Sequence, residues 1–430
     1  MIPASTPPNP RLCGCDEVSE RGLFSIEAAL GCIDASVTPL RQTEIVGLYQ
    51  AKGRILAADV LARSDLPAFD TSAMDGYAVN TDDLGTTAPV IVPLDGRSAA
   101  GDTPKTLRAG HAQRILTGAP VPRGANAVLM QERTTSTGDQ RVALNALPRS
   151  GENIRTRGEE IARGDTVLAA GTRLSARAIA AASAAGCASL PVRRRIRVAI
   201  LITGAELETA GDTLQGGQIW DINGPALHAA LQARDVDICS LAHCTDNADK
   251  IASQLEILSG KTDLVITTGG VSVGDEDHLQ TCISAVGGEV IFAGVALKPG
   301  KPVSFGRIGG CYWLGLPGNP LSALVTWQLF GIAVLDRLRG VRAKRKHSYV
   351  ISAVPIDHKP GRCEIRPATI VGHDPHGRAI VTCGSATHSG RVTNLPLADG
   401  LILIPSDISH LPEGAMLDFI PIDQNDGENG

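Results

Sequence analysis

Four irregular blocks carry the residue types best suited to chemistry. The first, DLPAFDTSAMDGYAV over residues 65–79, combines three Asp, a Pro and a Gly-Tyr pair with little apolar periodicity. This composition predicts a shaped surface loop. The other three blocks are rich in Gly or charge and follow apolar runs: TTGGVSVGDED from Thr267, LKPGKP from Leu297 and LPGNPLS from Leu316.

The Thr267 block has the composition of a phosphate site. Small residues follow the predicted strand DLVITT at close spacing: Gly269, Gly270, Ser272 and Gly274. Glycines let backbone N–H groups approach a phosphate, and a helix starting near Asp277 would add a positive dipole. The acids Asp275, Glu276 and Asp277 would then require a divalent cation to offset their repulsion with the phosphate. The alternative is that these acids only cap the helix.

The two remaining blocks indicate different chemistry. Lys298 and Lys301 place two ammonium groups on a chain stiffened by prolines, which favours an oxyanion. The same composition is also typical of an exposed turn. The LPGNPLS block leads an apolar strand into a helix, with Asn319 available as N-cap and Pro320 suited to the first turn. A helix start is expected there, so any function is an addition to it.

Residues 191–340 must position these blocks. They alternate between apolar strands, such as RVAILIT, DLVITT and CYWLGLP, and helices, and they end in a long helix from Asn319 to about Arg339. The pattern predicts a parallel or mixed sheet covered on both faces, which is a doubly wound α/β domain. Open sheets of this type bind ligands outside the carboxyl ends of their strands, where the three blocks fall.

The rest of the chain is expected to form smaller units. Residues 22–64 and 150–190 hold amphipathic helical patterns and predict a helical or linker domain. Residues 65–149 predict an inserted β domain, and residues 341–423 predict a C-terminal β domain. The tails are residues 1–21, with four prolines and no apolar face, and residues 424–430.

Composition excludes several classes of function. The net charge is −5, from 40 basic and 45 acidic residues, so we expect no nucleic-acid or membrane partner. No apolar run in the sequence approaches the length of a membrane span. The ten cysteines show no repeated spacing, and those in apolar runs, such as Cys187 and Cys239, are expected to pack as reduced thiols in the cytoplasm. Cys13 and Cys15 are too few for a tetrahedral metal site. The Arg193-Arg194-Arg195 run is expected to be a solvated linker.

Together the four blocks closely resemble the MoeA family of molybdopterin molybdenumtransferases, which includes the E domain of gephyrin. The resemblance spans about Leu23 to Pro421. It implies a multidomain α/β plus β fold with a central MogA-like domain. The implied reaction inserts molybdate into molybdopterin-AMP with Mg²⁺-dependent release of AMP. The implied assembly is a homodimer in which the β domain of one subunit reaches the active site of the other.

The resemblance also assigns roles to residues. Glu206, Asp246 and Asp277 would hold the metal near the pyrophosphate, while Lys298 and Lys301 would serve the oxyanion. Asp75 and Thr117 would reach in from the β domain. The substrate-binding candidates are Gly269, Gly270, Ser272, Gly274, Pro317, Gly318, Asn319, Pro320, Ser322, Arg366 and Ser385. Possible protein partners are a molybdopterin adenylyltransferase and molybdoenzyme apoproteins. The ten histidines are scattered, and structural roles are expected for them.

Departures from the family pattern leave alternatives open. Ala205 stands where relatives have an acid, Glu160 replaces an Asp, and Ile222 replaces a small polar residue. The surviving acids and lysines favour an active enzyme. A carrier paralogue that delivers finished cofactor without catalysis is the main alternative. The preceding adenylyltransferase step is less favoured, because it needs only the central domain. A pure scaffold is the least favoured. Residue types do not separate molybdate from tungstate.

Overall fold

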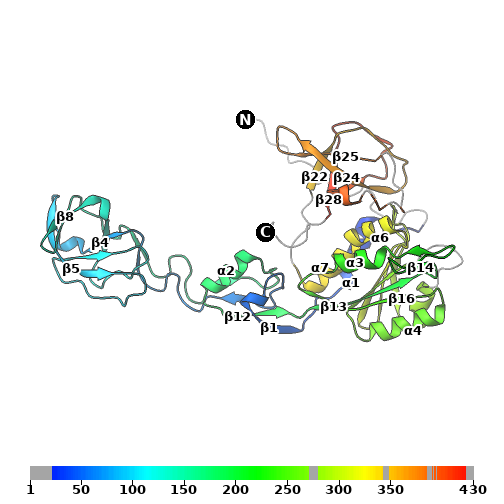
Figure 1. Cartoon of the computed structure of the whole chain (residues 1–430), viewed down its shortest axis with the longest axis horizontal. Coiled ribbons are helices and arrows are strands. Elements are labelled where there is room, and N and C mark those ends of the chain that lie inside the picture. Colours follow the sequence, from blue (N-terminus) through cyan, green and yellow to red (C-terminus); the bar gives the residue numbers. More distant parts are fainter. Residues whose placement is uncertain are drawn as a thin grey trace.

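The chain is elongated. The structure, a computed structural model, describes residues 22–270, 279–341, 348–384, 390, 392–393 and 395–422. Figure 1 shows a β domain with β5 (Val90–Ser98) at one end and a central unit with α2 (Ala176–Ala184) in the middle. An α/β domain with β13 (Ile196–Thr203) forms the other end, and the C-terminal β domain, in orange, lies beside it.

A mixed six-stranded sheet forms the centre of the α/β domain. Its strand order is β16-β13-β17-β21-β20-β18. β16, β13, β17 and β21 run parallel to one another, and β20 is antiparallel to both of its neighbours, β21 and β18, which confirms the predicted mixed sheet. The strands besides β13 are β16 (Val236–Cys244), β17 (Leu264–Thr268), β18 (Glu289–Ala293), β20 (Ser304–Ile308) and β21 (Cys311–Leu316).

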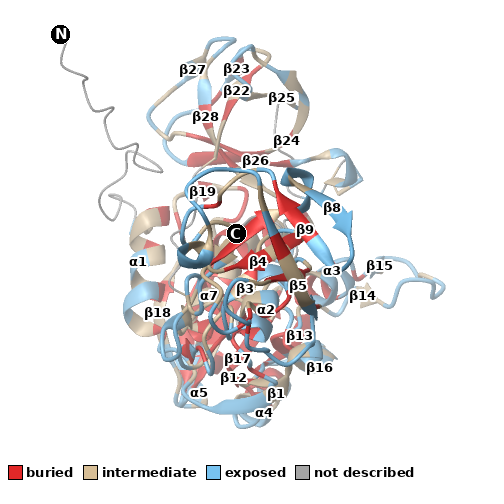
Figure 2. Cartoon of the chain, turned by 90° about the vertical axis from the view of Figure 1, so that its left-hand side faces the viewer, coloured by how far each residue is buried: buried red, intermediate tan, exposed pale blue. Residues whose placement is uncertain are grey.

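Helices cover both faces of this sheet. On β13, Val198 and Ile200 pack into one core with α3 (Asn223–Ala230). Ala199 and Leu201 point to the other face, against α4 (Ala248–Ser259) and α5 (Leu279–Ala285). Successive side chains of a strand alternate between faces, so an apolar strand such as RVAILIT supplies both cores. Figure 2 shows buried strands inside the domain and the exposed outer side of α4.

The long helix after β21 has three parts. It comprises α6 (Pro320–Thr326), a π-helical segment η4 (Trp327–Gly331) and α7 (Ile332–Arg339). Among the described residues this is the one helix long and apolar enough to span a membrane, but 72% of its apolar window is buried in the protein. The Trp327 ring occupies the space where a Cβ on Gly331 would lie, at 2.1 Å from its Cε3. The stretch is therefore a core helix.

The first helix packs differently from the expectation that residues 22–64 and 150–190 form one unit. In α1 (Ile26–Ser36), Ser25 caps the N-terminus by accepting a hydrogen bond from the Ala28 N–H (3.0 Å). The buried face of α1, including Ile33, joins the core of the α/β domain. Its amphipathic pattern predicted a helix but did not specify which domain would cover its apolar face.

The central unit contains more strand than helix. β1 (Thr43–Gly47) pairs with β12 (Ser189–Arg193), and Ser175 caps α2 by accepting from the Ala178 N–H (3.2 Å). Two short pairs complete it: β2 (Val60–Leu61) with β11 (Thr166–Leu168), and β3 (Thr71–Ser72) with β10 (Ile154–Arg155).

The inserted β domain contains part of the block that was expected to be a loop. Within residues 65–79, β4 (Gly76–Val79) is a central strand of the sheet β7-β4-β6-β5-β9-β8, so the loop prediction is wrong for GYAV. A Cβ on Gly76 would lie 2.1 Å from the Leu129 carbonyl oxygen, so only glycine lets these strands approach. The other strands are β6 (Ala112–Ile115), β7 (Ala127–Met130), β8 (Thr134–Gly138) and β9 (Arg141–Leu144).

The C-terminal domain is a closed β structure. β24 (Cys363–His373) pairs with both β25 (Ala379–Cys383) and β26 (Gly400–Ile404). β22 (Ser348–Ser352) and β28 (Met416–Pro421) complete the ring between β25 and β26. β23 (Ile356–Asp357) and β27 (His410–Leu411) form a small pair beside it. β19 (Leu297–Lys298), which belongs to the α/β domain in sequence, pairs with β24.

Two expectations about side-chain environments are wrong. Cys239 is exposed, because it lies on the edge strand β16, whereas Cys187 is buried as expected. Arg194 is not a solvated linker residue, because two of its guanidinium nitrogens donate to the Asp263 carboxylate (2.6 and 2.8 Å). Arg193 likewise donates to the Leu40 carbonyl. These arginines fasten the central unit to the α/β domain.

Burial raises the pKa of the Cys311 thiol to about 11, so that group packs as a neutral thiol.

Candidate active site

The carboxyl ends of the parallel strands bring two predicted blocks together. β17 leads into Gly269 and β21 leads into Gly318, and these strands are neighbours. A Cβ on Gly318 would lie 3.5 Å from the Gly269 Cα, so the backbones of the two blocks nearly touch. Ser272 and Gly274, predicted in the same block as Gly269, lie outside the described residues.

Glycine is required where β17 ends. Gly269 has φ +87°, and a Cβ there would lie 2.4 Å from the Thr203 carbonyl oxygen. Gly270 also has a positive φ, +61°. The Thr203 hydroxyl donates to the Thr268 carbonyl (3.0 Å), which joins the ends of β13 and β17. The two glycines therefore leave the backbone at the carboxyl end of β17 without covering side chains, as a phosphate site requires.

Two of the three predicted metal ligands lie at adjacent strand ends. Glu206 follows β13 and Asp246 follows β16, and both are exposed. Asp246 Oδ2 accepts a hydrogen bond from the Ala205 N–H (3.0 Å). The missing acid at Ala205 therefore leaves this backbone contact intact. Asp277 lies outside the described residues, within which no cluster of three metal-ligating side chains forms. Carboxylate oxygens from adjacent loops are the donor type that Mg²⁺ prefers, so the donor set fits.

A buried amide next to this edge was not singled out from sequence. Asn223, at the start of α3, donates from Nδ2 to the Gly318 carbonyl (2.8 Å). The buried Asp221 accepts from the Gly224 N–H (2.9 Å) and lies 3.0 Å from His243 Nε2. Ile222 between them is exposed, so its departure from the family pattern does not disturb these contacts. Closely spaced Asp and Asn before a helix are the sequence signal for such an arrangement.

The lysine block, LKPGKP over residues 297–302, lies against α6. A Cβ on Gly300 would lie 2.5 Å from Thr326 Cγ2 and 3.7 Å from the Ser322 carbonyl oxygen. Ser322 itself is buried, whereas Lys298 and Lys301 are partly exposed. Because α6 begins at Pro320, this contact places the lysine block beside the LPGNPLS block. Asn319 occupies the N-cap position, but its side chain makes no capping hydrogen bond.

Lys298 also meets a buried acid of the C-terminal domain. Its Nζ lies 3.5 Å from Glu364 Oε1, and Arg366 Nε donates to the same oxygen (3.1 Å). The guanidinium of Arg366 is buried and also donates to the carbonyls of Asp357 (2.8 Å) and Gly384 (3.1 Å). The structure thus brings the predicted oxyanion residues Lys298 and Arg366 together through Glu364, which sequence reasoning missed. Its signal was an opposite charge two residues before Arg366 on one strand. Ser385 lies outside the described residues.

Asp75 and Thr117 form a pair in the β domain. One Asp75 oxygen, Oδ1, accepts hydrogen bonds from the Thr117 N–H (2.7 Å) and hydroxyl (2.8 Å). These two bonds, the backbone one first, lower the pKa of Asp75 below its ordinary value of 3.8. Arg114 adds a favourable charge and donates to the Gly76 carbonyl (2.9 Å). The exposed Glu160 lies beside the start of this block, where its N–H donates to the Leu66 carbonyl (3.1 Å).

A single chain does not bring the two halves of the predicted site together. Figure 1 shows β4, which follows Asp75, at the opposite end of the molecule from β13 and β16. The central unit separates them. Asp75 and Thr117 therefore lie far from Asp246 and Lys298 within one chain.

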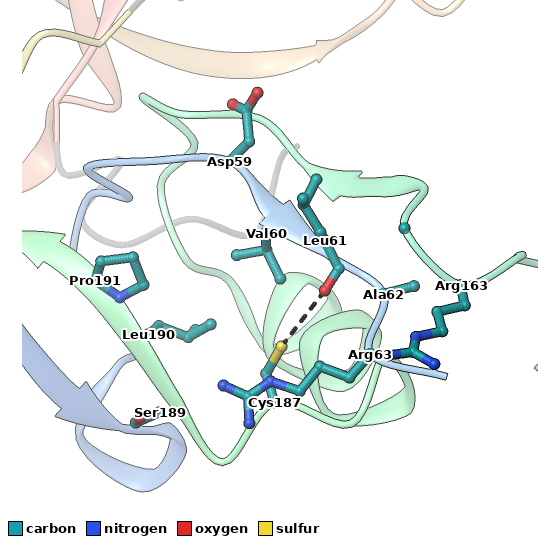
Figure 3. A pocket seen from close by; sticks show the side chains of 11 residues that line it. Asp59, Val60, Leu61, Ala62, Arg63, Arg163, Cys187, Ser189, Leu190 and Pro191 are labelled. Carbon is teal, nitrogen blue, oxygen red and sulfur yellow. Dashed lines mark hydrogen bonds between the residues drawn. The ribbon is translucent and has the colours of Figure 1, made fainter. Parts of the chain in front are cut away.

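A separate pocket lies in the central unit. It has a volume of ≈ 620 Å³ and none of its lining residues belongs to the predicted site. Figure 3 shows Arg63 and Arg163 among the residues that line it, and Cys187 Sγ lies 4.0 Å from the Leu61 carbonyl oxygen. We do not assign the chemistry to this pocket, because the Gly-rich loops and acids lie at the α/β sheet edge.

Comparisons with known proteins cover all the domains. Residues 24–186 match the MoeA N-terminal region (domain I and II), residues 199–337 a probable molybdopterin binding domain, and residues 349–422 the MoeA C-terminal region (domain IV). The chain is 36% identical over 328 residues to a molybdopterin molybdenumtransferase of Haemophilus influenzae, covering 76% of this chain and 80% of that protein. It is 36% identical over 383 residues to molybdopterin molybdenumtransferase 2 of Mycobacterium tuberculosis, covering 86% and 93%.

Solved structures agree with this likeness. A molybdopterin biosynthesis MoeA protein from Pyrococcus horikoshii superposes with a TM-score of 0.79 at 29% identity. The match covers 93% of this chain and 99% of that one. The similarity therefore extends over the order of the domains as well as over each domain.

Proposed function

Because the chain belongs to the MoeA family of molybdopterin molybdenumtransferases, a family of enzymes of molybdenum cofactor biosynthesis, we propose that it inserts molybdate into molybdopterin-AMP and releases AMP. Two molybdenum–sulfur bonds form from the two dithiolene sulfurs, and one molybdate oxygen leaves as water with the two thiol protons. One water cleaves the phosphoanhydride to give the pterin phosphate and AMP. The reaction needs a phosphate cradle and an oxyanion site but no protein nucleophile.

The loops at the carboxyl ends of the parallel strands supply the phosphate cradle in this proposal. Gly269 and Gly318 allow the pyrophosphate to approach the backbone at the ends of β17 and β21. Asn223 fixes the Gly318 carbonyl, which holds the second loop in place. Glu206 and Asp246, with Asp277, would hold a Mg²⁺ ion beside the pyrophosphate. When bound, this ion supplies charge that offsets the negative phosphate oxygens.

The lysine block supplies the oxyanion site. Lys298 and Lys301 carry the charges that attract molybdate, and the neighbouring Arg366 extends the positive region across the domain boundary. The charges are preorganised because the block is held against α6 through Gly300. Preorganised cations stabilise charge that develops on oxygen during the reaction.

The separation of Asp75 from the sheet edge supports a shared site. We propose a homodimer in which Asp75 and Thr117 of one subunit face the sheet edge of the other. The elongated shape with a β domain at the far end permits such an exchange (Figure 1). We further propose that the protein acts on small-molecule substrates in the cytoplasm. Its proposed protein partners are a molybdopterin adenylyltransferase and molybdoenzyme apoproteins.

The observation that carries the proposal is the meeting of three predicted blocks at one place: the glycines after β17, the loop before α6, and the lysine block packed on α6. The test mixes the protein with molybdopterin-AMP, Mg²⁺ and molybdate and follows AMP. We expect molybdate-dependent AMP release that Asp246→Asn lowers strongly. Asp249→Asn, on the exposed first turn of α4, is the matched control and should release AMP normally.

The carrier alternative gives a different result in the same assay. A carrier would bind molybdopterin-AMP or finished cofactor but would release no AMP under any condition. The altered Ala205 and Glu160 segments would then be its distinguishing feature. Retention of the Ala205 N–H bond to Asp246 favours the enzyme.

A further inference from the structure

The lysine block is attached to the C-terminal domain by a short parallel strand pair. In the register of β19 and β24, Leu297 lies opposite Cys363 and Lys298 lies opposite Glu364. The Cys363 N–H donates to the Ala296 carbonyl (3.0 Å). Paired residues in register point to the same face of a sheet, so the side chains of Lys298 and Glu364 stand beside each other.

Glu364 is a buried acid surrounded by cations. Its side chain is 2% exposed, and Oε1 contacts both Lys298 Nζ (3.5 Å) and Arg366 Nε (3.1 Å). The other oxygen, Oε2, lies 2.9 Å from His358 Nδ1. A buried carboxylate is costly unless it is paired, so these contacts fix its position. Glu364 is therefore a rigid anchor contributed by one domain to a side chain of another.

Lys298 differs from its partners in its access to solvent. Its side chain is 42% exposed, whereas Arg366 and His358 are almost completely buried. An ammonium group has three N–H donors, and one contact to Glu364 leaves two for a further acceptor. Arg366 already donates to three protein oxygens in the described structure. Lys298 is thus the member of the cluster best placed to contact a ligand from solvent.

We propose that Glu364 is a positioning residue for the proposed reaction, acting through Lys298. It holds the ammonium group at the boundary of the two domains with two N–H donors turned toward an incoming oxyanion. It does not contact substrate. The inference rests on the proposed function, because it assigns a role within the same oxyanion site. It also gives the C-terminal domain a specific task, which is to set the geometry of the lysine block.

The first test measures oxyanion dependence in Glu364→Gln. The amide keeps the shape and an acceptor for Arg366 but loses the charge that attracts Lys298. We expect the KM for molybdate to rise about 10-fold, which corresponds to the loss of one charge-assisted contact. The KM for molybdopterin-AMP and the kcat at saturating molybdate should stay close to native. A general structural defect would instead lower kcat and raise both KM values.

The matched control is Glu289→Gln. Glu289 forms an exposed ion pair with Arg307 Nη2 (2.8 Å) on β18, far along the same sheet from β17. This change removes a strand carboxylate and its ion pair without touching the lysine block, so the KM for molybdate should not change. Thermal unfolding of both variants shows whether either change disturbs the fold.

A double-mutant cycle identifies the path of the effect. If Glu364 acts through Lys298, then Glu364→Gln should add nothing to the KM for molybdate in a Lys298→Ala background. A penalty of the same size in both backgrounds overturns the proposal, since it would show that Glu364 acts on the fold. An unchanged KM for molybdate in the single Glu364→Gln variant also overturns it.

Direct binding separates this inference from the proposed function. Isothermal titration calorimetry of the native protein with tungstate alone measures binding at the oxyanion site without turnover. We expect Glu364→Gln and Lys298→Ala each to weaken tungstate binding, with no additional loss in the double variant. That result supports the positioning role even if no AMP is released, in which case the proposed reaction alone fails. Normal AMP release with unchanged tungstate affinity in Glu364→Gln overturns the positioning role alone.

Discussion

The pair Asp75–Thr117 and the pair Lys298–Glu364 show two ways of holding a functional side chain. The first joins residues within one β domain, is largely open to solvent, and depends on hydrogen bonds of 2.7 and 2.8 Å. The second joins two domains around a carboxylate that is 2% exposed. A local pair survives wherever its domain folds, whereas an interdomain pair requires the two domains to dock.

The two pairs also lie in regions that a single chain keeps apart. Figure 1 shows the β domain and the α/β domain at opposite ends, so neither region alone holds all the predicted functional residues. Two questions follow for the molecule. The first is whether both pairs serve one reaction, and the second is whether the stability of each pair depends on the other region.

The largest expected effect tests the shared site. Asp75→Asn and Lys298→Ala should each lower AMP release about 10²–10³-fold, as loss of a preorganised charged group does. A heterodimer of the two variants, purified through two different tags, should recover about half of the native rate, because one of its two sites then contains only native residues. The measurement is AMP release per dimer.

A heterodimer that stays inactive would contradict a shared site. If Asp75 and Lys298 of the same chain served one site, each site of the heterodimer would carry one defect and no activity would return. A dimer of two differently tagged Lys298→Ala chains is the control for tag effects. Recovery would join the two regions in one reaction, and its absence would separate them.

Much of the α/β region could be predicted from the sequence. The apolar strands, the Gly269 turn and the Pro320 helix start are local signals, and the predicted mixed sheet is confirmed. The contact between Glu364 and Lys298 could not be found in this way, because the two residues lie in different domains and no periodicity reports a contact between domains. The position of α1 was missed for the same reason, since an apolar helix face does not identify its partner.

The inserted β domain shows the opposite error. GYAV was expected in a loop because the Asp, Pro and Gly around it are turn formers, yet the tertiary structure makes it the strand β4. The close approach of Gly76 to Leu129 explains the glycine, but this reason is visible only in the folded sheet. A short strand flanked by turn-forming residues thus escapes prediction from propensity.

Gly76→Ala tests whether the β domain is stabilised independently. A Cβ 2.1 Å from the Leu129 oxygen should push β4 away from the neighbouring edge strand β7 and destabilise this domain by about 2–4 kcal/mol. Gly85→Ala in the same domain meets no atom within 4 Å and is the control. Hydrogen exchange read by peptide mass spectrometry should show faster exchange in β4, β6 and β7 and no change in β13 or β17. Faster exchange in both domains would show that they are energetically coupled.

A smaller effect is expected from Gly300→Ala on the other side of the comparison. Gly300 has φ +116°, and a Cβ would lie 2.5 Å from Thr326 Cγ2, so the lysine block must move away from α6. We expect a loss of about 1–3 kcal/mol in unfolding free energy. The KM for molybdate should rise while binding of molybdopterin-AMP is kept. Gly310→Ala, which meets nothing within 4 Å, is the control. If Gly300→Ala and Gly310→Ala changed the KM for molybdate equally, Gly300 would have no specific role in the oxyanion site.

The smallest effect concerns the local pair and is a shift in titration. The two hydrogen bonds from Thr117 lower the pKa of Asp75, so the folded state favours the ionised form. A depressed carboxyl pKa contributes stability that is present above the unfolded pKa and is lost as the pH falls through the folded pKa, which here means below about pH 4.

Thr117→Val removes only the hydroxyl bond, while the stronger backbone N–H bond remains. The pKa of Asp75 should therefore rise part of the way toward its ordinary value, which carbon-detected NMR of the carboxyl group can follow. Asp65, whose pKa is lowered first by the backbone N–H of Arg163, lies outside this pair and should not respond. A pKa of Asp75 that stayed unchanged would mean that the hydroxyl contributes nothing and that the backbone alone holds the acid. In that case the local pair would be fixed by the fold of the β domain rather than by the identity of residue 117.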